Sequence, residues 1–269
     1  MVFSESEITQ FQEQGFVAKP SFFNLRETAA IQAEIQRLKA EGRLRNVTTE
    51  GDGKTRSQVK QNLQLCPMSP HSRLFRALPF HAKVVDAIAA LIGDPVILHL
   101  DQVFLKPEKH GSGTNWHQDN AYFQIADPMQ GTAMWIAVHD ATVANGTLHV
   151  IPRSHRERYE HSRDPESDHH IRCYPREADA MPVELPSGGV VFFSYGTAHC
   201  TRANTTENER AGAAFHFLNG NAISPCYFKR ENGGMKHPLL TGAQASGGSE
   251  EYDVVVAGTW EEEIARALS

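Results

Sequence analysis

The 269-residue sequence lacks any long hydrophobic run, since its longest apolar stretch is AIAALIG at residues 87–93. A membrane-spanning helix needs about 20 consecutive apolar residues, so we expect no membrane partner. The first residues, MVFSESEITQFQEQGF, have neither the basic start nor the apolar segment of a signal peptide. These absences predict a cytoplasmic protein.

The sequence also has few cysteines and no excess of basic residues. The four cysteines form no CxxC pair, which argues against a zinc ribbon or a thioredoxin-like site, and reduced thiols fit a cytosol. Lysine and arginine number 26 against 32 aspartate and glutamate residues, a formal net charge of −6. A mildly acidic surface argues against nucleic acid as the main partner. No pattern in the sequence indicates an oligomeric state.

The first third of the sequence carries helical patterns. Apolar residues at helical spacing predict helices over 5–14, 26–40 and 80–92. Ser6 is the expected N-cap of the first helix, and Pro79 is expected to open the third. The segment 43–58 is polar and contains glycine, so we expect a loop there.

From Pro95 onward, short β-rich runs alternate with turn residues, which predicts an antiparallel sandwich or barrel flanked by helices. The runs are VILHLDQVFL, TAMWIAVHD, TLHVIP, VVFFS, HCTR and AGAAFHFL. We expect one domain over 1–269, with a mostly helical flank at 1–94, the β core at 95–220 and a C-terminal extension at 221–269. The charged segment 153–180 and the Gly-, Ser- and Lys-rich segment 229–250 are candidate lids.

The run Asn115-Trp116-His117-Gln118-Asp119 holds the strongest local signal for chemistry. On an extended chain, His117 and Asp119 lie on the same face, because they are two residues apart. An imidazole and a carboxylate side by side make two thirds of a facial metal triad. HxD alone also occurs by chance, so a third ligand is required.

His199, at the end of a later β run, is the candidate third ligand. If Asn204 and Thr205 form the turn of a hairpin, His199 pairs with Arg210, because both are equidistant from that turn. A guanidinium beside a metal site can hold the far carboxylate of a 2-oxo acid whose near end chelates the metal. The joint pattern is much more specific than any of its parts.

These residues resemble those of the phytanoyl-CoA dioxygenase family of Fe(II)- and 2-oxoglutarate-dependent oxygenases. The resemblance covers most of the chain. It is carried by the runs DQVFLKPEKHGSGTNWHQDNAYF, AMWIAVHDATVANGTLHVIPRSH and GTAHCTRANTTENERAGAAFHF. It implies a fold that is mainly β with flanking helices, a double-stranded β-helix or cupin-like jelly roll with the N-terminal helices packed outside.

The resemblance also implies roles for individual residues. His117, Asp119 and His199 would bind iron, and Arg210 and Thr201 would hold the distal carboxylate of 2-oxoglutarate. Further contacts with 2-oxoglutarate would come from a tryptophan, a glutamine on the strand before HQD, and a basic residue near KQNLQL, namely Trp135, Gln102 and Lys60. The alternatives to Lys60 are Gln61, Asn62 and Gln64.

Side chains after the metal motif are candidates for the substrate wall. Asn120, Tyr122 and Phe123 follow Asp119 directly, although aromatic residues beside a barrel mouth also serve plain packing. The tandem His169-His170 has the composition of a second metal site. A solvated loop explains this pair better, and we expect that reading.

The implied reaction couples O2-dependent oxidation of a small-molecule C–H bond to decarboxylation of 2-oxoglutarate, which releases succinate and CO2. Hydroxylation is the leading expectation, and Asp119 argues against halogenation, since related halogenases have a small residue there. Desaturation, epimerisation, cyclisation and endoperoxidation use the same cofactors and stay open. A jelly-roll metal sensor without turnover and a zinc or manganese hydrolase of cupin type are the other classes, and both leave Arg210 unexplained.

Overall fold

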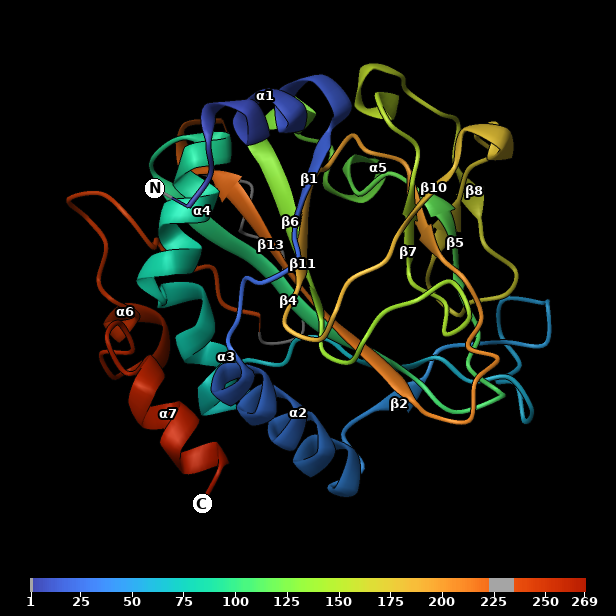
Figure 1. The fold of residues 1–269 in the computed structure, drawn as a ribbon, viewed down its shortest axis with the longest axis horizontal. Coiled ribbons are helices and arrows are strands. Elements are labelled where there is room, and N and C mark those ends of the chain that lie inside the picture. Colours follow the sequence, from blue (N-terminus) through green and yellow to red (C-terminus); the bar gives the residue numbers. More distant parts are fainter. Residues whose placement is uncertain (1, 223–234) are drawn as a thin grey trace.

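The computed structural model describes residues 2–222 and 235–269, which form two main β-sheets, a small β-ribbon and flanking helices (Figure 1). The α-helices are α1 (Glu5–Gln14), α2 (Leu25–Ala40), α3 (Arg73–Ala77), α4 (Ala82–Ile92), α5 (Asn120–Phe123), α6 (Ser249–Tyr252) and α7 (Trp260–Ala267). The strands are β1 (Phe16–Lys19), β2 (Arg45–Asn46), β3 (Leu63–Leu65), β4 (Val96–Lys106), β5 (Thr114–His117), β6 (Gly131–Ala137), β7 (Leu148–Val150), β8 (Ser162–Arg163), β9 (Ile171–Arg172), β10 (Met181–Val183), β11 (Val190–Ser194), β12 (His199–Thr201) and β13 (Arg210–Asn219).

The larger sheet has seven strands in the order β1-β11-β6-β13-β4-β3-β2. Along its centre, β13 pairs antiparallel with β4, which places Arg210 opposite Lys106 and Ala214 opposite Gln102. On its other side β13 pairs with β6, and Ala214 lies opposite Trp135. Because successive side chains alternate between the faces of a strand, these five residues share one face of the sheet.

The smaller sheet has four strands in the order β10-β7-β12-β5 and faces the larger one. Apolar side chains from both sheets, including Leu148 and Val150 of the smaller sheet and Trp135 and Phe193 of the larger, form a shared cluster. The face-to-face antiparallel sheets with helices outside confirm the predicted jelly-roll class. In the described residues the two sheets do not close into a barrel.

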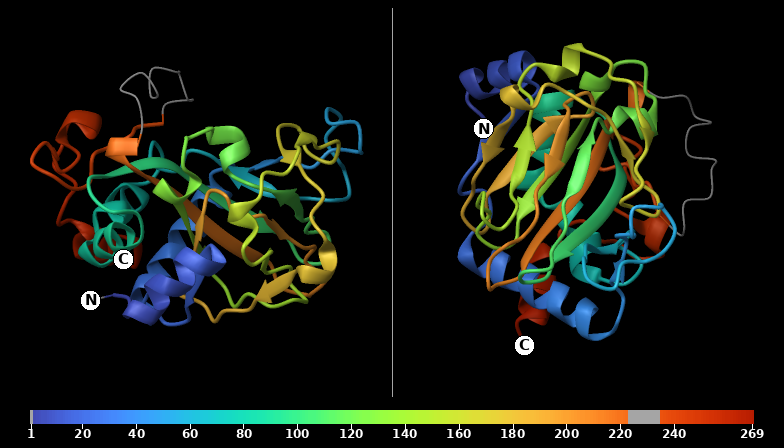
Figure 2. Two further views of the ribbon diagram at one scale, coloured as in Figure 1. Left: turned by 90° about the horizontal axis from the view of Figure 1, so that it is seen from above. Right: turned by 90° about the vertical axis from the view of Figure 1, so that its right-hand side faces the viewer.

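The helices cover the opposite face of the larger sheet. In Figure 1 and in the left view of Figure 2, α2, α4 and α7 lie on one side of this sheet, and the yellow segment around residues 160–180 lies far from them. Ile31, Ile35 and Leu38 form the fully buried stripe of α2. They join Phe215 and Phe217 of β13 in the largest apolar cluster, which holds the sheet in place from behind.

Three details of the helical part differ from the sequence predictions. The N-cap of α1 is Ser4, which forms a capping box with Glu7, so the expectation for Ser6 was wrong. Pro79 lies in a short 3-10 helix (Leu78–Phe80), and α4 begins only at Ala82. The predicted helical flank also contributes β1, β2 and β3 to the larger sheet. The sequence analysis did not predict these strands, because they are too short to show a periodic pattern.

The C-terminal segment returns to the helices. Trp260 at the start of α7 donates from Nε1 to Glu27 of α2 at 3.0 Å, and Arg73 of α3 pairs with Glu263 of α7. Part of the candidate lid at 229–250, residues 229–234, lies outside the described residues. Across the described chain, every helix is too short or too polar to cross a membrane.

Candidate active site

A cavity of about 210 Å³ lies between the two sheets. The smaller sheet and the turn after it contribute His117, Asp119 and His199, and the larger sheet contributes Trp135 and Arg210. The remaining lining is largely aromatic and aliphatic. It includes Leu100, Phe104, Tyr122, Phe123, Leu148 and Phe193.

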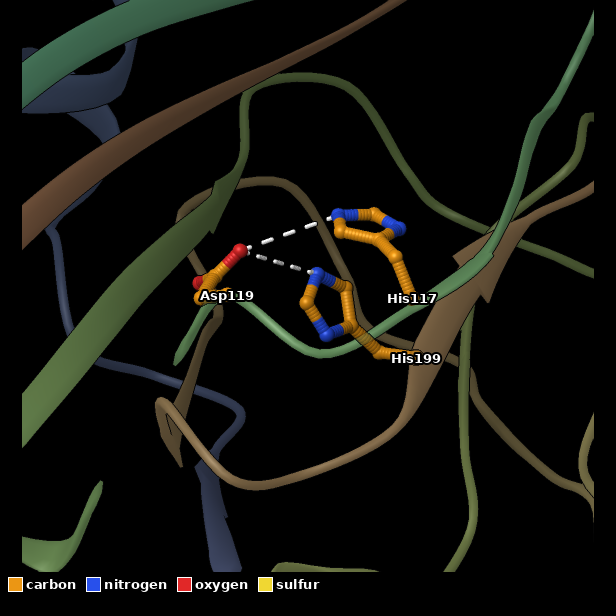
Figure 3. A group of neighbouring side chains, drawn as sticks. All are labelled: His117, Asp119 and His199. Atoms are coloured by element: carbon orange, nitrogen blue, oxygen red, sulfur yellow. Dashed lines mark ion pairs between the residues drawn. The ribbon is translucent and has the colours of Figure 1, made fainter. Parts of the chain in front are cut away.

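His117, Asp119 and His199 converge at one place on the cavity wall (Figure 3). His117 ends β5, Asp119 immediately precedes α5, and His199 begins β12 as the cross-strand partner of His117. The Nε2 atoms of His117 and His199 lie 3.7 Å and 3.8 Å from Oδ1 of Asp119. One ligand atom from each of the three side chains lies within 4.8 Å of the others.

Backbone carbonyls orient both imidazoles. Nδ1 of His117 lies 2.8 Å from the carbonyl oxygen of Asn115, and Nδ1 of His199 lies 2.9 Å from that of Thr197. A carbonyl only accepts hydrogen bonds, so each Nδ1 carries the proton and each Nε2 keeps its lone pair. Both lone pairs are therefore available for a metal ion at the point that Asp119 faces.

Electrostatics keep the three ligands in the protonation states that a metal needs. Burial lowers the pKa of His199 to about 4, with a further contribution from His117, and burial also lowers the pKa of His117. For Asp119, burial alone would raise the pKa, but the neighbouring histidines hold it below its usual range. At neutral pH the site contains two neutral imidazoles and one carboxylate.

This donor set fits non-haem iron. Two imidazoles and one carboxylate on one side of an ion leave several coordination positions open, the arrangement typical of Fe(II) oxygenases. A structural zinc site would instead be closed by four protein ligands, and the described residues supply three here.

Arg210 lies in the same cavity and is 1% exposed. Its Nε and Nη2 atoms donate to the carbonyl oxygens of Asn145 and Gly146. The guanidinium carbon lies 5.5 Å from the centre of the Trp135 ring, within cation–π range. That approach requires Gly212, where a Cβ atom would stand 2.7 Å from the Trp135 ring. Burial lowers the pKa of Arg210 to about 9, so it stays a cation at neutral pH.

Thr201 and Gln102, two of the residues predicted to contact 2-oxoglutarate, also line the cavity. Oγ1 of Thr201 accepts a hydrogen bond from the backbone of Thr114 at 3.1 Å, which fixes its rotamer. Gln102 accepts one from Nε2 of Gln64 at 2.9 Å, and Gln64 lines the cavity too.

Lys60 does not reach this cavity, and its side chain is exposed. It lines a separate hollow formed by residues 48–51, 57–60 and 109–113. Among the residues near 60 that the sequence left open, Gln64 is the one that lines the cavity, because β3 pairs with β4 and places it opposite Phe104, within hydrogen-bond distance of Gln102.

The predicted hairpin between His199 and Arg210 is wrong. His199 pairs with His117 and Val150 in the smaller sheet, whereas Arg210 pairs with Lys106 in the larger one. The chain between them crosses from one sheet to the other. The two side chains therefore line the same cavity from different sheets and are not neighbours on one ladder.

The three candidates for the substrate wall divide into two kinds. Tyr122 and Phe123 line the cavity, and Tyr122 also accepts a hydrogen bond from the backbone of Ile171 at 2.9 Å. Asn120 instead exchanges two hydrogen bonds with the backbone of Ile125, at 3.1 Å and 3.0 Å. Its side chain therefore ties the start of α5 to Ile125 just after the helix, and it is absent from the cavity lining.

Two histidines at the cavity have a place that the sequence analysis did not predict. His170 is only 8% exposed, packs against Phe104 and lines the cavity, so the expectation of a solvated loop was wrong for His170, whereas His169 is exposed. His216 places Nε2 at 3.2 Å from Oδ2 of Asp119. Its even spacing from Arg210 on β13 was the available signal, because residues 210, 212, 214 and 216 share a face.

Comparison with known proteins shows the family to which this chain belongs. The family model of phytanoyl-CoA dioxygenase (PhyH) matches residues 11–212, well over half of the chain. Ectoine dioxygenase of Halomonas elongata is 25% identical over 231 residues, which cover 79% of this chain and 69% of the relative.

Solved structures agree on the fold. The non-haem α-ketoglutarate-dependent epimerase SnoN from nogalamycin biosynthesis superposes with a TM-score of 0.69 at 20% identity, covering 88% of this chain and 98% of that one. EctD from S. alaskensis, solved with 2-oxoglutarate and 5-hydroxyectoine, gives 0.66 at 20% identity, with coverage of 86% and 85%. The chain belongs to the phytanoyl-CoA dioxygenase family and is an iron- and 2-oxoglutarate-dependent oxygenase.

Proposed function

We propose that the protein hydroxylates an unactivated C–H bond of a small molecule, with Fe(II), 2-oxoglutarate and O2. In this proposal His117, Asp119 and His199 hold the iron, and Arg210 with Thr201 holds the distal carboxylate of 2-oxoglutarate. The supporting observation is that one cavity contains both the three-ligand group and a buried guanidinium. A sensor or a hydrolase would need only the first of these.

O2 is the oxidant. Bound iron would activate it, and the oxidative decarboxylation of 2-oxoglutarate to succinate and CO2 would supply electrons for its reduction. The protein supplies position. Nδ1–H groups bonded to backbone carbonyls keep the Nε2 atoms of His117 and His199 aimed at one point. Arg210 fixes the far end of the cosubstrate, with Trp135 beneath its guanidinium as a flat support.

The substrate side of the cavity is lined by Phe104, Tyr122, Phe123 and His170, with Gln102 and Gln64 as its uncharged polar pair. An aromatic lining of this kind favours a substrate that presents an apolar chain or ring to the iron.

Cys66, Cys173 and Cys200 are free thiols, which supports the cytoplasm as the compartment.

The test is an anaerobic titration of the metal-free protein with Fe(II) and then 2-oxoglutarate. Chelation of the 2-oxo acid by iron gives a weak visible charge-transfer band, which we expect for the parent. His199→Ala removes an iron ligand and should abolish the band. Arg210→Ala should keep iron but need far more 2-oxoglutarate, on the order of 100-fold, because a charge-assisted bidentate contact is lost.

The result decides between the function classes. A band that forms in the parent and responds to both variants as stated supports the oxygenase and its site, and product analysis with candidate substrates then follows. If the parent binds iron but forms no band with 2-oxoglutarate, the proposal fails, and a metal sensor or hydrolase replaces it.

A further inference from the structure

Lys106, the last residue of β4, is a second buried basic residue beside Arg210. Its side chain is completely buried, and it is the cross-strand partner of Arg210. A lysine is almost never fully buried unless an anion accompanies it. Nothing in the established activity assigns a role to this residue.

Both basic side chains converge on one backbone oxygen. Nζ of Lys106 lies 3.3 Å from the carbonyl oxygen of Gly146 and also donates to that of Arg202. Nη2 of Arg210 donates to the same Gly146 oxygen. Gly146 has φ of 77°, and a Cβ atom there would overlap the carbonyl of Arg202, so only glycine brings these carbonyls together.

No negative charge balances the pair within the described chain. Neither Lys106 nor Arg210 forms an ion pair there, and only carbonyl oxygens accept their hydrogen bonds. The titratable groups that face Lys106 are Arg210 on β13, Cys200 on β12 and His149 on β7. Burial, and then the charge of Arg210, holds the pKa of Lys106 well below its usual value.

We propose that Lys106 is a positioning residue for the cosubstrate, which takes up a proton from solvent when the distal carboxylate of 2-oxoglutarate binds to Arg210. Before binding, the neutral amine is favoured, because two adjacent buried cations without an anion would repel each other. After binding, the carboxylate neutralises Arg210, and the ammonium form of Lys106 then holds Gly146 and the guanidinium in place. This inference rests on the proposed role of Arg210 as the carboxylate clamp.

The experiment is anaerobic calorimetry of the Fe(II)-loaded protein with 2-oxoglutarate near pH 7, in two buffers of different ionisation enthalpy. The difference in heat gives the number of protons taken up on binding. Lys106→Met keeps the length of the side chain without its charge. Lys109→Met is the matched control, because Lys109 is exposed and pairs with Glu207 instead. A second ligand, 2-oxopentanoate, lacks the distal carboxylate.

We expect proton uptake in the parent and in Lys109→Met, and none in Lys106→Met. The affinity of Lys106→Met for 2-oxoglutarate should fall roughly tenfold, while its affinities for Fe(II) and for 2-oxopentanoate stay unchanged. If Lys106→Met does not fold, Lys106→Arg replaces it, since a permanent cation should bind 2-oxoglutarate without proton uptake.

Three results would overturn the inference: a parent that binds 2-oxoglutarate without proton uptake, uptake that persists in the variant, or equal losses for both ligands. Equal losses would show that Lys106 serves the fold only. Failure of the parent to bind 2-oxoglutarate would instead refute the proposed function itself. Arg210→Ala, measured in parallel, separates these cases, because it tests the clamp without altering Lys106.

Discussion

The two faces of the larger sheet use the same strands for different purposes. Ala214 and Phe215 are neighbours on β13, yet Ala214 lines the cavity and Phe215 packs among the helices. The helix side of β13 is apolar from Ala211 and Ala213 to Phe215 and Phe217, and belongs to one cluster with residues of α2, α3 and α4. The cavity side alternates small residues, such as Gly212, with polar ones, such as Arg210.

Because of this difference, one residue of a strand serves the stability of the fold and its neighbour serves ligand binding. Every residue of β6 and of β13 is buried, so burial alone does not distinguish the faces. Size and polarity do, because a binding cavity needs both space and hydrogen-bonding groups. Substitutions on the helix side should therefore change unfolding, and those on the cavity side should change ligand binding.

The largest effect is expected on iron affinity when histidines of the smaller sheet are replaced. There too, one histidine lines the cavity and another does not. His117→Ala should lose iron affinity by more than about 100-fold, because a direct ligand is removed. His149→Ala should bind iron normally. Like the two ligand histidines, His149 bonds a backbone carbonyl through Nδ1, which lies 3.1 Å from the carbonyl oxygen of Thr147. Unlike them, it is absent from the cavity lining.

Anaerobic calorimetry with Fe(II) measures both affinities. Equal iron binding by His117→Ala and the parent would remove His117 from the site. Loss of iron in His149→Ala, with an unchanged circular dichroism spectrum, would show that the two faces of this sheet are not functionally distinct.

Phe215→Ala tests the helix side of the larger sheet. The side chain is fully buried and contacts the ring of Phe75, so its removal should lower the free energy of unfolding by about 3–5 kcal/mol. Iron and 2-oxoglutarate affinities of the folded protein should stay within about twofold. Ala214→Gly, one residue away, should cost about 1 kcal/mol or less.

Urea unfolding of the metal-free proteins gives these free energies. A loss of iron affinity in Phe215→Ala under conditions where it is fully folded would contradict the separation of the two faces.

The local motifs were predictable from the sequence because their information is local. Residues two apart on an extended chain share a face, so HxD predicts that His117 and Asp119 converge whatever the rest of the fold does. The β-rich runs after Pro95 likewise appear as strands, since their composition and turn residues are local signals. His199 was a candidate third ligand from its place at the end of a β run, and the family resemblance then implied the jelly-roll fold and the role of each ligand.

Pairing and approach across the cavity were not predictable in this way. Asn204 looks like a hairpin turn, but it is buried and its side chain bonds the backbone of Lys106, Pro107 and Asn208, fixing a crossover between sheets. His170 reads as part of a polar loop, and only the packing of that loop over the cavity buries it. Such contacts depend on tertiary structure, which single-sequence patterns do not encode.

Gly212→Ala tests the cavity side through packing. The added methyl group would lie 2.7 Å from the Trp135 ring, so the ring must move away from Arg210. We expect a loss of about 1–3 kcal/mol from overpacking, and a 2-oxoglutarate affinity lowered roughly tenfold. Calorimetry and urea unfolding measure the two effects.

The control is Trp135→Phe, which removes the indole atoms that the methyl group would meet. Added to Gly212→Ala, it should restore part of the lost stability, so that the two substitutions together cost less than their sum. Strict additivity would mean that Gly212 acts by some route other than its contact with Trp135.

The smallest effect is expected on ligand affinity when Gln64 of β3 or Lys60 just before it is replaced. Gln64→Ala removes the hydrogen-bond donor that orients Gln102, and should raise the apparent Kd for 2-oxoglutarate or for substrate several-fold, in line with about 1 kcal/mol for one hydrogen bond. Lys60→Ala should change neither, because Lys60 is exposed and lines a different hollow. If Lys60→Ala weakens 2-oxoglutarate binding and Gln64→Ala does not, the loop at residues 57–60 must close over the cavity when the cosubstrate binds, and the basic residue predicted from the sequence is the true contact.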